Sequence, residues 1–273
     1  MKALKLPAIP LDAHKYSRGS LLVIGGSTRF PGAAILAARS SALTGAGYVT
    51  LAIPAPALPV AQSQMLSIPV IGGKALEGAF AADALPGILE LVNHVDAIVI
   101  GPGLTVTDST MDFVRLVQTW ADEANIPLLL DADALRAAPF YPAKNTRRII
   151  TPHAGELARL FASTATATAG ELALQQGVIV VAKGPVTIIT DGARETSCNE
   201  GTPALAKAGT GDVLSGIIGS LLAQGMEAFE AAEAGVIIHA RAGCYAEKTY
   251  GTRSVMAEHL LEALPAVLRE ALA

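Results

Sequence analysis

Short runs of apolar residues recur along the chain, and each is followed by a turn rich in glycine, proline or polar residues. Continuous apolar runs of this kind are typical of strands that are buried on both faces of a sheet. The pattern predicts strands within residues 20–27, 48–54, 95–104 and 126–135, a strand at the start of residues 147–160, and two strands within residues 177–192.

Between these strands, apolar residues recur at the spacing of one helix face. Alternating strands and helices predict an α/β protein with a mainly parallel central sheet and helices on both faces. No linker, low-complexity tract or internal repeat interrupts the pattern, so residues 1–273 are expected to form a single domain. Helices are predicted at residues 33–47, 83–93, 109–124, 156–161, 211–222, 227–248 and 255–272.

Composition narrows the class of protein further. Hydrophobic residues make up 51% of the 273 residues and charged residues only 16%, which is typical of a folded chain with a full core. The net charge of -4 gives no reason to expect a nucleic acid or an anionic membrane surface as partner. Any bound phosphate must therefore be held locally, by backbone amides and single lysines.

The cysteines and the N-terminus indicate where the protein works. Two isolated cysteines, Cys198 and Cys244, are too few for a disulfide framework, and they are expected to be free thiols in a reducing cytosol. The first 20 residues lack the apolar centre of a signal peptide, and no apolar stretch is long enough to span a membrane. We therefore expect a cytoplasmic protein.

Polar and glycine-rich turns follow the predicted strands. In a parallel sheet these turns lie at one edge, beyond the carboxyl ends of the strands, where ligands bind. We expect the ligand site at this edge, although topology alone accounts for part of the clustering. The turns lie at residues 25–27, 101–103, 131–133, 151–156 and 183–185.

One turn carries a specific chemical signal. The chain has neither a G-x-x-x-x-G-K-[ST] loop nor a G-x-G-x-x-G turn after a strand, so phosphates must be bound in another way. In "AGTGD" (residues 208–212), Gly209 and Gly211 let the backbone approach a ligand, and the free amides of the helix that follows attract anions. Asp212 could take the proton of a hydroxyl that attacks a phosphoryl group. It could instead cap the helix, but Thr210 could fill that role, which favours the base.

At these residues the chain resembles a known family. "AGTGDVLSGIIGSLLAQG" resembles the GTGD helix of the NAD(P)H-hydrate dehydratases, which have a ribokinase-like fold. Further stretches match in order and together cover nearly the whole chain. They are "HKYSRGSLLVIGGSTRFPGAAILAARSSALTGAGYV", "IGPGL", "LLDADAL", "TPHAGELARL", "VVAKGPVTII" and "AAEAGVIIHARAGCYAEK".

The resemblance implies a lyase that repairs hydrated NADH and NADPH. ADP, or ATP in other branches, would phosphorylate the hydroxyl of the hydrated nicotinamide ring with Mg²⁺ present. Phosphate then leaves and the dihydropyridine is restored, giving AMP and phosphate when ADP is the donor. Phosphorylation makes the hydroxyl a good leaving group, which the ring nitrogen can expel. The metal ligands are not indicated by the sequence.

The resemblance also assigns residues. It places Asp212 at the hydroxyl as the catalytic base, and Gly211 near the nucleotide phosphates. Gly103, His153 and a position near Ala42 in the first helix would contact the hydrated nucleotide. The loop that would hold the adenosine phosphates consists of Lys183, Gly184, Pro185, Val186 and Thr187.

Each residue outside the helix start also has a structural interpretation. His153 could be a turn histidine bonded to backbone, Lys183 a solvated turn residue, and Ser27 a turn-closing hydroxyl. Glu156 could either complement a helix N-terminus or organise Mg²⁺ and water. Three residues favour a structural role: Asp131 and Asp133 as strand-end or capping residues, and His239 as a core histidine.

Some residues depart from the family pattern, and two other functions remain open. Thr202-Pro203 and Lys207-Ala208 replace residues that the family commonly has before GTGD, which bears on the nucleotide loop and on the choice of ADP or ATP. The epimerase domain that often accompanies this family is expected to be absent from these 273 residues and to be a separate partner. The family suggests a homo-oligomer, with a tetramer as the expected form. A ribokinase-like kinase of a small hydroxylated metabolite, or a non-catalytic nucleotide-binding protein, are the alternatives.

Overall fold

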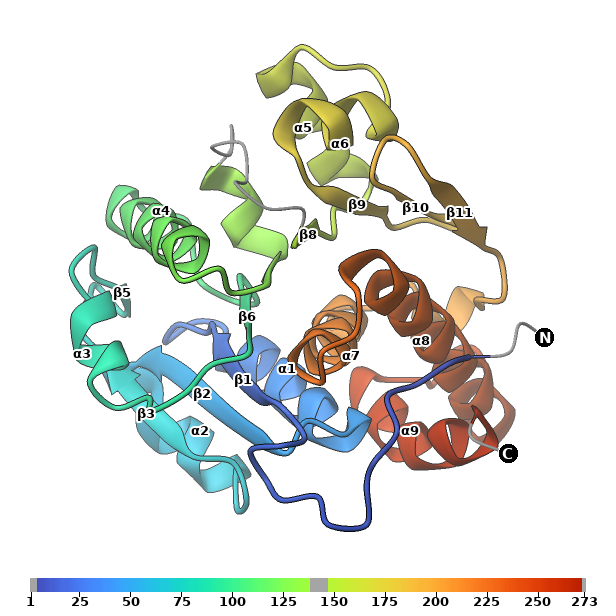
Figure 1. Cartoon of the computed structure of the whole chain (residues 1–273), viewed down its shortest axis with the longest axis horizontal. Coiled ribbons are helices and arrows are strands. Elements are labelled where there is room, and N and C mark those ends of the chain that lie inside the picture. The colour runs from blue at the N-terminus through green and yellow to red at the C-terminus, as the bar shows by residue number, and fades with distance from the viewer. Residues whose placement is uncertain (1–3, 138–146, 272–273) are drawn as a thin grey trace.

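The strands form one sheet whose centre is parallel (Figure 1). The computed structural model describes residues 4–137 and 147–271. Within those residues the sheet has nine strands in the order β11-β10-β9-β8-β7-β6-β1-β2-β3. Strand β10 runs antiparallel to both β9 and β11, and all the other pairs are parallel. The strands are β1 (Ser20–Ile24), β2 (Tyr48–Pro54), β3 (Val70–Gly73), β6 (Ala97–Ile100), β7 (Leu128–Leu130), β8 (Arg148–Ile150), β9 (Ile179–Ala182), β10 (Thr187–Thr190) and β11 (Glu195–Cys198).

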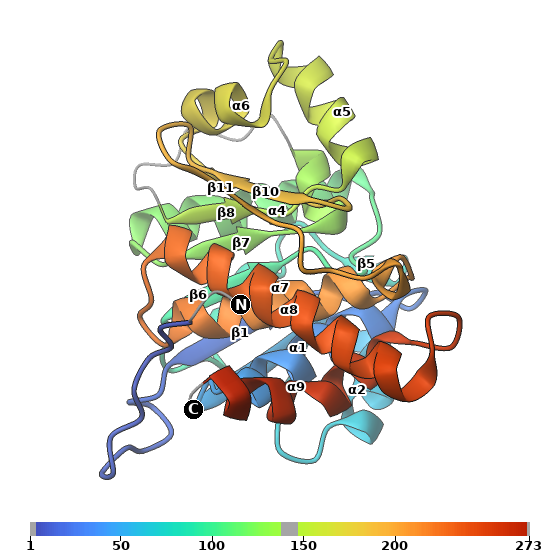
Figure 2. The same ribbon diagram turned by 90° about the vertical axis from the view of Figure 1, so that its right-hand side faces the viewer.

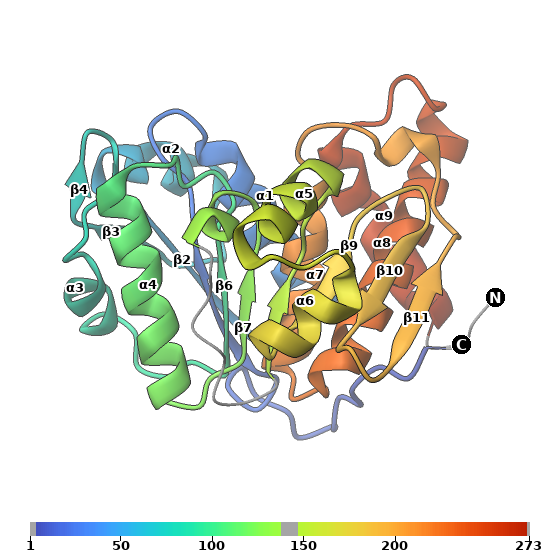
Figure 3. The same cartoon turned by 90° about the horizontal axis from the view of Figure 1, so that it is seen from above.

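Helices cover both faces of this sheet, as Figure 3 shows from above. Strand β1 illustrates why, since Leu21 and Val23 enter one core while Leu22 and Ile24 enter the other. The predicted mainly parallel, doubly covered sheet is therefore confirmed. One layer holds α1 (Pro31–Thr44), α2 (Leu58–Gln64), α7 (Thr210–Ala223), α8 (Ala228–Tyr250) and α9 (Ala257–Ala271); the other holds α3 (Leu85–Leu89), α4 (Asp108–Glu123), the 3-10 helix η2 (Ala132–Ala137), α5 (Ala154–Thr164) and α6 (Ala169–Gln176).

Several elements were not anticipated by the hydrophobic pattern. These are the edge strands β3 and β11, the helices α2 and α6, and the small hairpin of β4 (Ala75–Leu76) and β5 (Ala79–Phe80). The predicted C-terminal helix is present as α9, but its expected end at Leu272 lies outside the described residues.

Small residues let α7 pack closely against α1, which lies beneath it in Figure 2. A Cβ atom at Gly216 would lie 2.0 Å from the Ser40 hydroxyl oxygen and 2.1 Å from the Ala37 carbonyl oxygen. The Ser41 hydroxyl lies 2.7 Å from the Ala37 carbonyl oxygen and 3.0 Å from that of Gly216, and so can donate to either helix. The first turn of α7, which carries Asp212, is thus held by a rigid helix pair.

Gly216→Ala is expected to destabilise the protein by about 1–3 kcal/mol, because the added methyl group would push two backbones apart. At an open helix position the same change is favourable by about 1 kcal/mol, so the expected sign is reversed. Urea unfolding followed by circular dichroism measures the difference. Gly170→Ala in α6 is the matched control, because a Cβ at Gly170 meets no atom within 4 Å. Equal stabilities for the two variants would contradict the packing argument.

Candidate active site

The carboxyl ends of β7, β8 and β9 and the N-terminus of α7 converge on the carboxylate of Asp131. Asp131 is 1% exposed and directly follows β7. The Lys183 ammonium lies 2.9 Å from its Oδ1 atom, and the Thr151 hydroxyl donates to the same atom at 2.7 Å. The Ser215 hydroxyl of α7 donates to Oδ2 at 2.7 Å. Three strand ends and one helix are therefore joined through a single buried carboxylate.

The Lys183 ammonium also lies beside the first turn of α7. A Cβ atom at Gly211 would be 3.4 Å from Nζ, so glycine leaves the space between the lysine and the helix open. Free backbone amides at a helix N-terminus attract anions, and an ammonium beside them adds a full positive charge. This end of α7 is thus suited to a phosphate group. Lys183 is paired and largely buried rather than a solvated turn residue.

Asp212 is the third residue of α7 and does not cap the helix. The N-cap residue is Gly209, with φ of +92°, and no side chain of the described residues caps this end. Thr210 does not cap it either, contrary to expectation, because its hydroxyl donates to the carbonyl oxygens of Leu205 and Lys207. The Asp212 carboxylate, partly buried, is consequently left available at the mouth of the helix.

Burial and neighbouring charges raise the pKa of Asp212 to about 7. Burial contributes most, and the negative charge of Asp131 adds to it. The Lys183 ammonium acts in the opposite direction, and Asp133 raises the pKa further. A carboxyl group that titrates near neutral pH can accept a proton and release it again, as a general base requires.

His153 and Glu156 form the start of α5. The His153 Nδ1 atom accepts hydrogen bonds from the amides of Gly155 at 3.0 Å and Glu156 at 3.4 Å. The Glu156 carboxylate accepts from the His153 amide at 2.8 Å, which completes a capping box. In the neutral ring Nε2 therefore carries the proton. Nε2 lies 3.5 Å from Glu156 Oε1, and the His153 side chain is 57% exposed, so a ligand can still reach this ring.

Gly103 lies against the start of α1 in a left-handed conformation, with φ of +70°. A Cβ atom there would lie 2.3 Å from the Phe30 carbonyl oxygen. The neighbouring turn is joined to it, since the Gly26 amide donates to the Pro102 carbonyl at 2.7 Å. The turns after β1 and β6 thus form one close-packed wall at the carboxyl edge. Ser27 closes its own turn by accepting from the Phe30 amide.

Ala42 is not brought to this edge. Helix α1 begins next to the carboxyl end of β1 and runs back along the sheet, so its last turn lies near the amino ends of the strands. There the Ala42 carbonyl accepts from the Gly45 amide, and the Gly47 amide donates to Gly19, just before β1. The expectation that Ala42 contacts the substrate together with Gly103 and His153 is not supported by this placement.

The loop from Lys183 to Thr187 connects the antiparallel pair β9 and β10. Its first amide, that of Lys183, donates to the Pro152 carbonyl at 2.8 Å. Its last hydroxyl, that of Thr187, donates to the Gly184 carbonyl at 3.3 Å, and the Val186 side chain between them is 50% exposed. The loop is therefore fixed at both ends, next to His153 and above α7.

His239 of α8 supports the first turn of α7 from behind. Its Nε2 atom lies 2.8 Å from the Thr210 carbonyl oxygen, and burial lowers its pKa to about 4. The ring is therefore neutral at pH 7 and donates to that carbonyl through Nε2. This agrees with the interpretation of His239 as a core histidine.

The described residues contain no group of three or more His, Cys, Asp or Glu side chains that could hold a metal ion. Asp131 is already occupied by three donors, and Glu156 by the capping box. Mg²⁺ commonly binds through one or two carboxylates together with substrate phosphates. A magnesium ion here would consequently depend on the phosphates for its ligands, and no protein residue is assigned to it.

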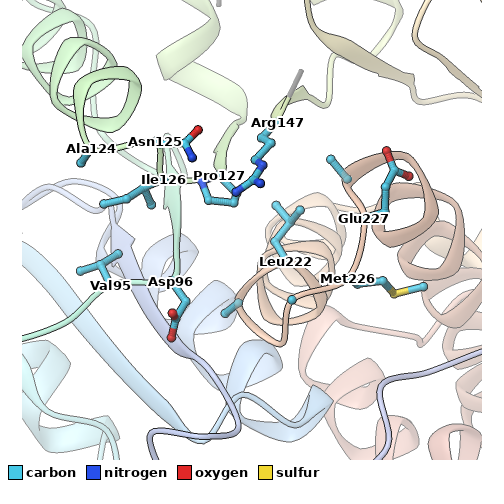
Figure 4. A pocket seen from close by; sticks show the side chains of 13 residues that line it. Val95, Asp96, Ala124, Asn125, Ile126, Pro127, Arg147, Leu222, Met226 and Glu227 are labelled. Carbon is cyan, nitrogen blue, oxygen red and sulfur yellow. The ribbon is translucent and has the colours of Figure 1, made fainter. Parts of the chain in front are cut away.

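A cavity of about 580 Å³ lies at the opposite edge of the sheet (Figure 4). Its lining includes Val95 and Asp96 before β6, Ile126 and Pro127 before β7, and residues that follow α7. These positions are at the amino ends of the strands. The cavity is therefore separate from the Asp212 site, and none of the residues assigned to substrate or nucleotide lines it.

The parallel sheet, with a carboxylate in the first turn of a glycine-flanked helix beyond its carboxyl edge, defines a ribokinase-like protein. A ribokinase-like superfamily protein of Enterococcus faecalis superposes with a TM-score of 0.84 at 24% identity, covering 97% of this chain and 92% of that chain. The model of the family described as NAD(P)H-hydrate dehydratase matches residues 21–266. The chain belongs to this NAD(P)H-hydrate dehydratase family.

Individual relatives give the same family. The bifunctional NAD(P)H-hydrate repair enzyme Nnr of Moorella thermoacetica is 36% identical over 97% of this chain, and the match covers 52% of that enzyme. The chain thus spans about half the length of this relative. The ADP-dependent (S)-NAD(P)H-hydrate dehydratase of Xanthomonas campestris is 35% identical over 97% of this chain and 94% of its own length. The ADP/ATP-dependent NAD(P)H-hydrate dehydratase of Bacillus subtilis, co-crystallised with ATP/Mg²⁺, has a TM-score of 0.84 at 30% identity and covers 97% and 94% of the two chains.

Proposed function

We propose that this protein is an ADP-dependent (S)-NAD(P)H-hydrate dehydratase, a carbon-oxygen lyase that restores NADH and NADPH from their hydrates. The observation that carries the proposal is the position of Asp212. Its carboxylate titrates near neutral pH, beside the Lys183 ammonium and the free amides of α7. Family membership narrows the hydroxylated substrate to the hydrated nicotinamide ring. Residues 1–273 would form one dehydratase domain.

Each residue of the site has its own role in the proposed reaction. Asp212 takes the proton from the ring hydroxyl as that oxygen attacks the terminal phosphoryl group of ADP, and AMP leaves. The ring nitrogen then expels phosphate from carbon, and loss of a neighbouring ring proton restores the double bond. Lys183 and the amides at Gly211 stabilise the negative charge of the transferred group. Gly103 and His153 lie on the side where the hydrated nucleotide would bind.

The assay that tests the proposal follows the near-ultraviolet absorbance of the dihydronicotinamide. Purified protein is mixed with acid-made NADH hydrate, Mg²⁺ and ADP, with ATP in a parallel sample. A rise that requires nucleotide supports the dehydratase and identifies the donor. A flat trace with both nucleotides, from folded protein, would favour a ribokinase-like kinase of another small alcohol.

Lys183→Ala is expected to weaken ADP binding about 10–100-fold, because a charge-assisted hydrogen bond contributes about 1.5–3 kcal/mol. Isothermal titration calorimetry measures the affinity. Arg115→Ala on α4 is the control, since it removes one positive charge from an exposed pair with Asp112, away from the site. An unchanged affinity in the Lys183 variant would mean that this ammonium does not contact the phosphates.

No helix of the described residues is both long and apolar enough to cross a membrane. With Cys198 and Cys244 both free, we place the protein in the cytoplasm. We also propose a homo-oligomer, with a tetramer as the form the family suggests, and a separate epimerase that supplies the reactive hydrate epimer.

A further inference from the structure

Asp131 is a buried carboxylate that the proposed reaction does not use directly. It is 1% exposed, and both of its oxygens are engaged by donors from the protein. Burial opposes its charge, yet the Lys183 ammonium and the bound hydroxyls keep the pKa of Asp131 below its usual value. It therefore stays ionised in a place where an unpaired charge would be very unfavourable. Such an arrangement suggests a role in organising the charges around it.

Several carboxylates at this site interact electrostatically with one ammonium group, that of Lys183. Burial opposes the charge of Lys183, but Asp131 outweighs that effect and raises the pKa of the lysine, with smaller contributions from Glu156 and Asp212. The Lys183 ammonium lies 2.9 Å from Oδ1 of Asp131. Asp212 makes no hydrogen bond to the lysine within the described residues. The Lys183 ammonium is therefore paired with Asp131, and it makes no ion pair with Asp212.

We propose that Asp131 is a positioning residue: by binding Nζ of Lys183, it holds the ammonium beside the first turn of α7 and prevents it from pairing with Asp212. The ammonium remains available to a phosphate, and Asp212 remains available as a base. The consequence for catalysis rests on the proposed function, whereas the placement of the charges does not. Asp131 is not expected to touch the substrate.

A second pairing is open to the ammonium. If Asp131 carried no charge, the carboxylates that still act on the Lys183 ammonium would be those of Glu156 and Asp212. Glu156 is engaged by the His153 amide in the capping box. The ammonium would therefore move toward Asp212. An ammonium within about 4–6 Å lowers a carboxyl pKa by about 1–3 units.

The other charged groups around Asp212 do not replace this effect. Asp133 follows β7 and raises the pKa of Asp212, and its Oδ2 atom is held by the Thr105 amide at 3.0 Å. His239, which packs behind α7 from α8, is neutral at pH 7. Replacing Asp131 with a neutral residue therefore has two effects on Asp212. It removes one negative charge nearby, and it releases Lys183, the one cation among the charges of the described residues that act on Asp212.

The test is a carbon NMR titration of the Asp212 side-chain carboxyl in the protein without nucleotide or substrate. In Asp131→Asn the titration midpoint of Asp212 is expected to fall by at least about one pH unit from the wild-type value. Asp96→Asn is the matched control: it is the same chemical change at the amino edge, where Asp96 accepts from the Ser20 amide, and it should leave the midpoint unchanged. An unchanged or higher midpoint in folded Asp131→Asn overturns the proposal.

A double-mutant cycle separates positioning from the simple loss of a charge. In a Lys183→Met background there is no ammonium to release, so Asp131→Asn should lower the midpoint by less than it does in the wild type. Equal shifts in the two backgrounds would mean that Asp131 acts only through its own charge, which contradicts the proposal.

The wild-type protein gives a test that does not depend on the variants folding. Nitrogen NMR of the Lys183 ammonium should show a resonance that changes little while Asp212 titrates, because the ammonium is bound to Asp131 throughout. A resonance that follows Asp212 with the amplitude of a direct ion pair would overturn the proposal. Neither NMR measurement requires turnover, so the dehydratase proposal can fail without affecting this result. If turnover is found, the pH–rate midpoint of Asp131→Asn should move with the NMR midpoint.

Discussion

Asp212→Asn is expected to lower turnover of the hydrated nucleotide by about 10²–10⁴-fold, because an amide cannot accept the hydroxyl proton. The affinity for ADP should change far less, since the lysine and the helix amides that bind phosphate remain. The absorbance assay gives turnover and calorimetry gives affinity. A variant that turns over at nearly the wild-type rate would exclude Asp212 as the base.

The stability of Asp212→Asn at different pH values shows whether the variant has lost only its catalytic base or has also lost its fold. The pKa of Asp212 is about 7 in the folded protein, whereas the ordinary pKa of an aspartate, which applies to the unfolded chain, is 3.8. Between those values the folded state binds more protons than the unfolded chain, so this group makes the free energy of unfolding fall as pH rises. Removing the charge should therefore make Asp212→Asn at least as stable as the wild type at about pH 8. A clearly lower melting temperature there would contradict the burial argument.

The reaction rate should rise with pH and level off above the midpoint of Asp212, about 7. Only the ionised carboxylate can act as a base, so each pH unit below the midpoint should lower the rate about tenfold, to about one hundredth near pH 5. The measurement is kcat/KM across this range, with circular dichroism at each pH to verify the fold. A flat profile would show that proton transfer to Asp212 does not limit the rate.

Lys183→Ala supplies the internal control for that profile. The ammonium lowers the pKa of Asp212, so its removal should move the midpoint to higher pH. A group outside the site that happened to titrate near neutral pH would not respond to this change. The direction of the shift therefore identifies the titrating residue independently of the size of the rate.

The sequence predicts most of the sheet and the helix that carries Asp212. Continuous apolar runs located the parallel strands from β1 to β9 apart from β3, because strands covered on both faces have no polar side. Strand β11 was missed because its residues are largely exposed, and β3 because its two glycines lack side chains. The capping box of Thr168 and Glu171 is the sequence signal for helix α6, and it is separate from the hydrophobic pattern.

The charge pairing within the site could not be predicted in the same way. Asp131 and Lys183 are 52 residues apart, and only the order of the strands brings β7 and β9 to either side of β8. A lone aspartate after a strand has the same local pattern whether it caps, binds a metal or pairs with a lysine. The placement of Ala42 could not be predicted for a related reason, since helical periodicity does not say which end of a helix lies near the ligand.

The contact between His153 and Lys183 has a consequence for how two ligands would bind. The two residues pair as an isolated parallel bridge, so the segments after β8 and β9 continue side by side beyond the sheet. One segment belongs to the proposed dinucleotide side and the other to the proposed ADP side. The Lys183 amide donates to the Pro152 carbonyl, so a ligand that ordered either segment would restrain its neighbour through this hydrogen bond and would link the two affinities. Such linkage is reciprocal: whatever factor ADP contributes to retention of the hydrated dinucleotide, the dinucleotide contributes to retention of ADP.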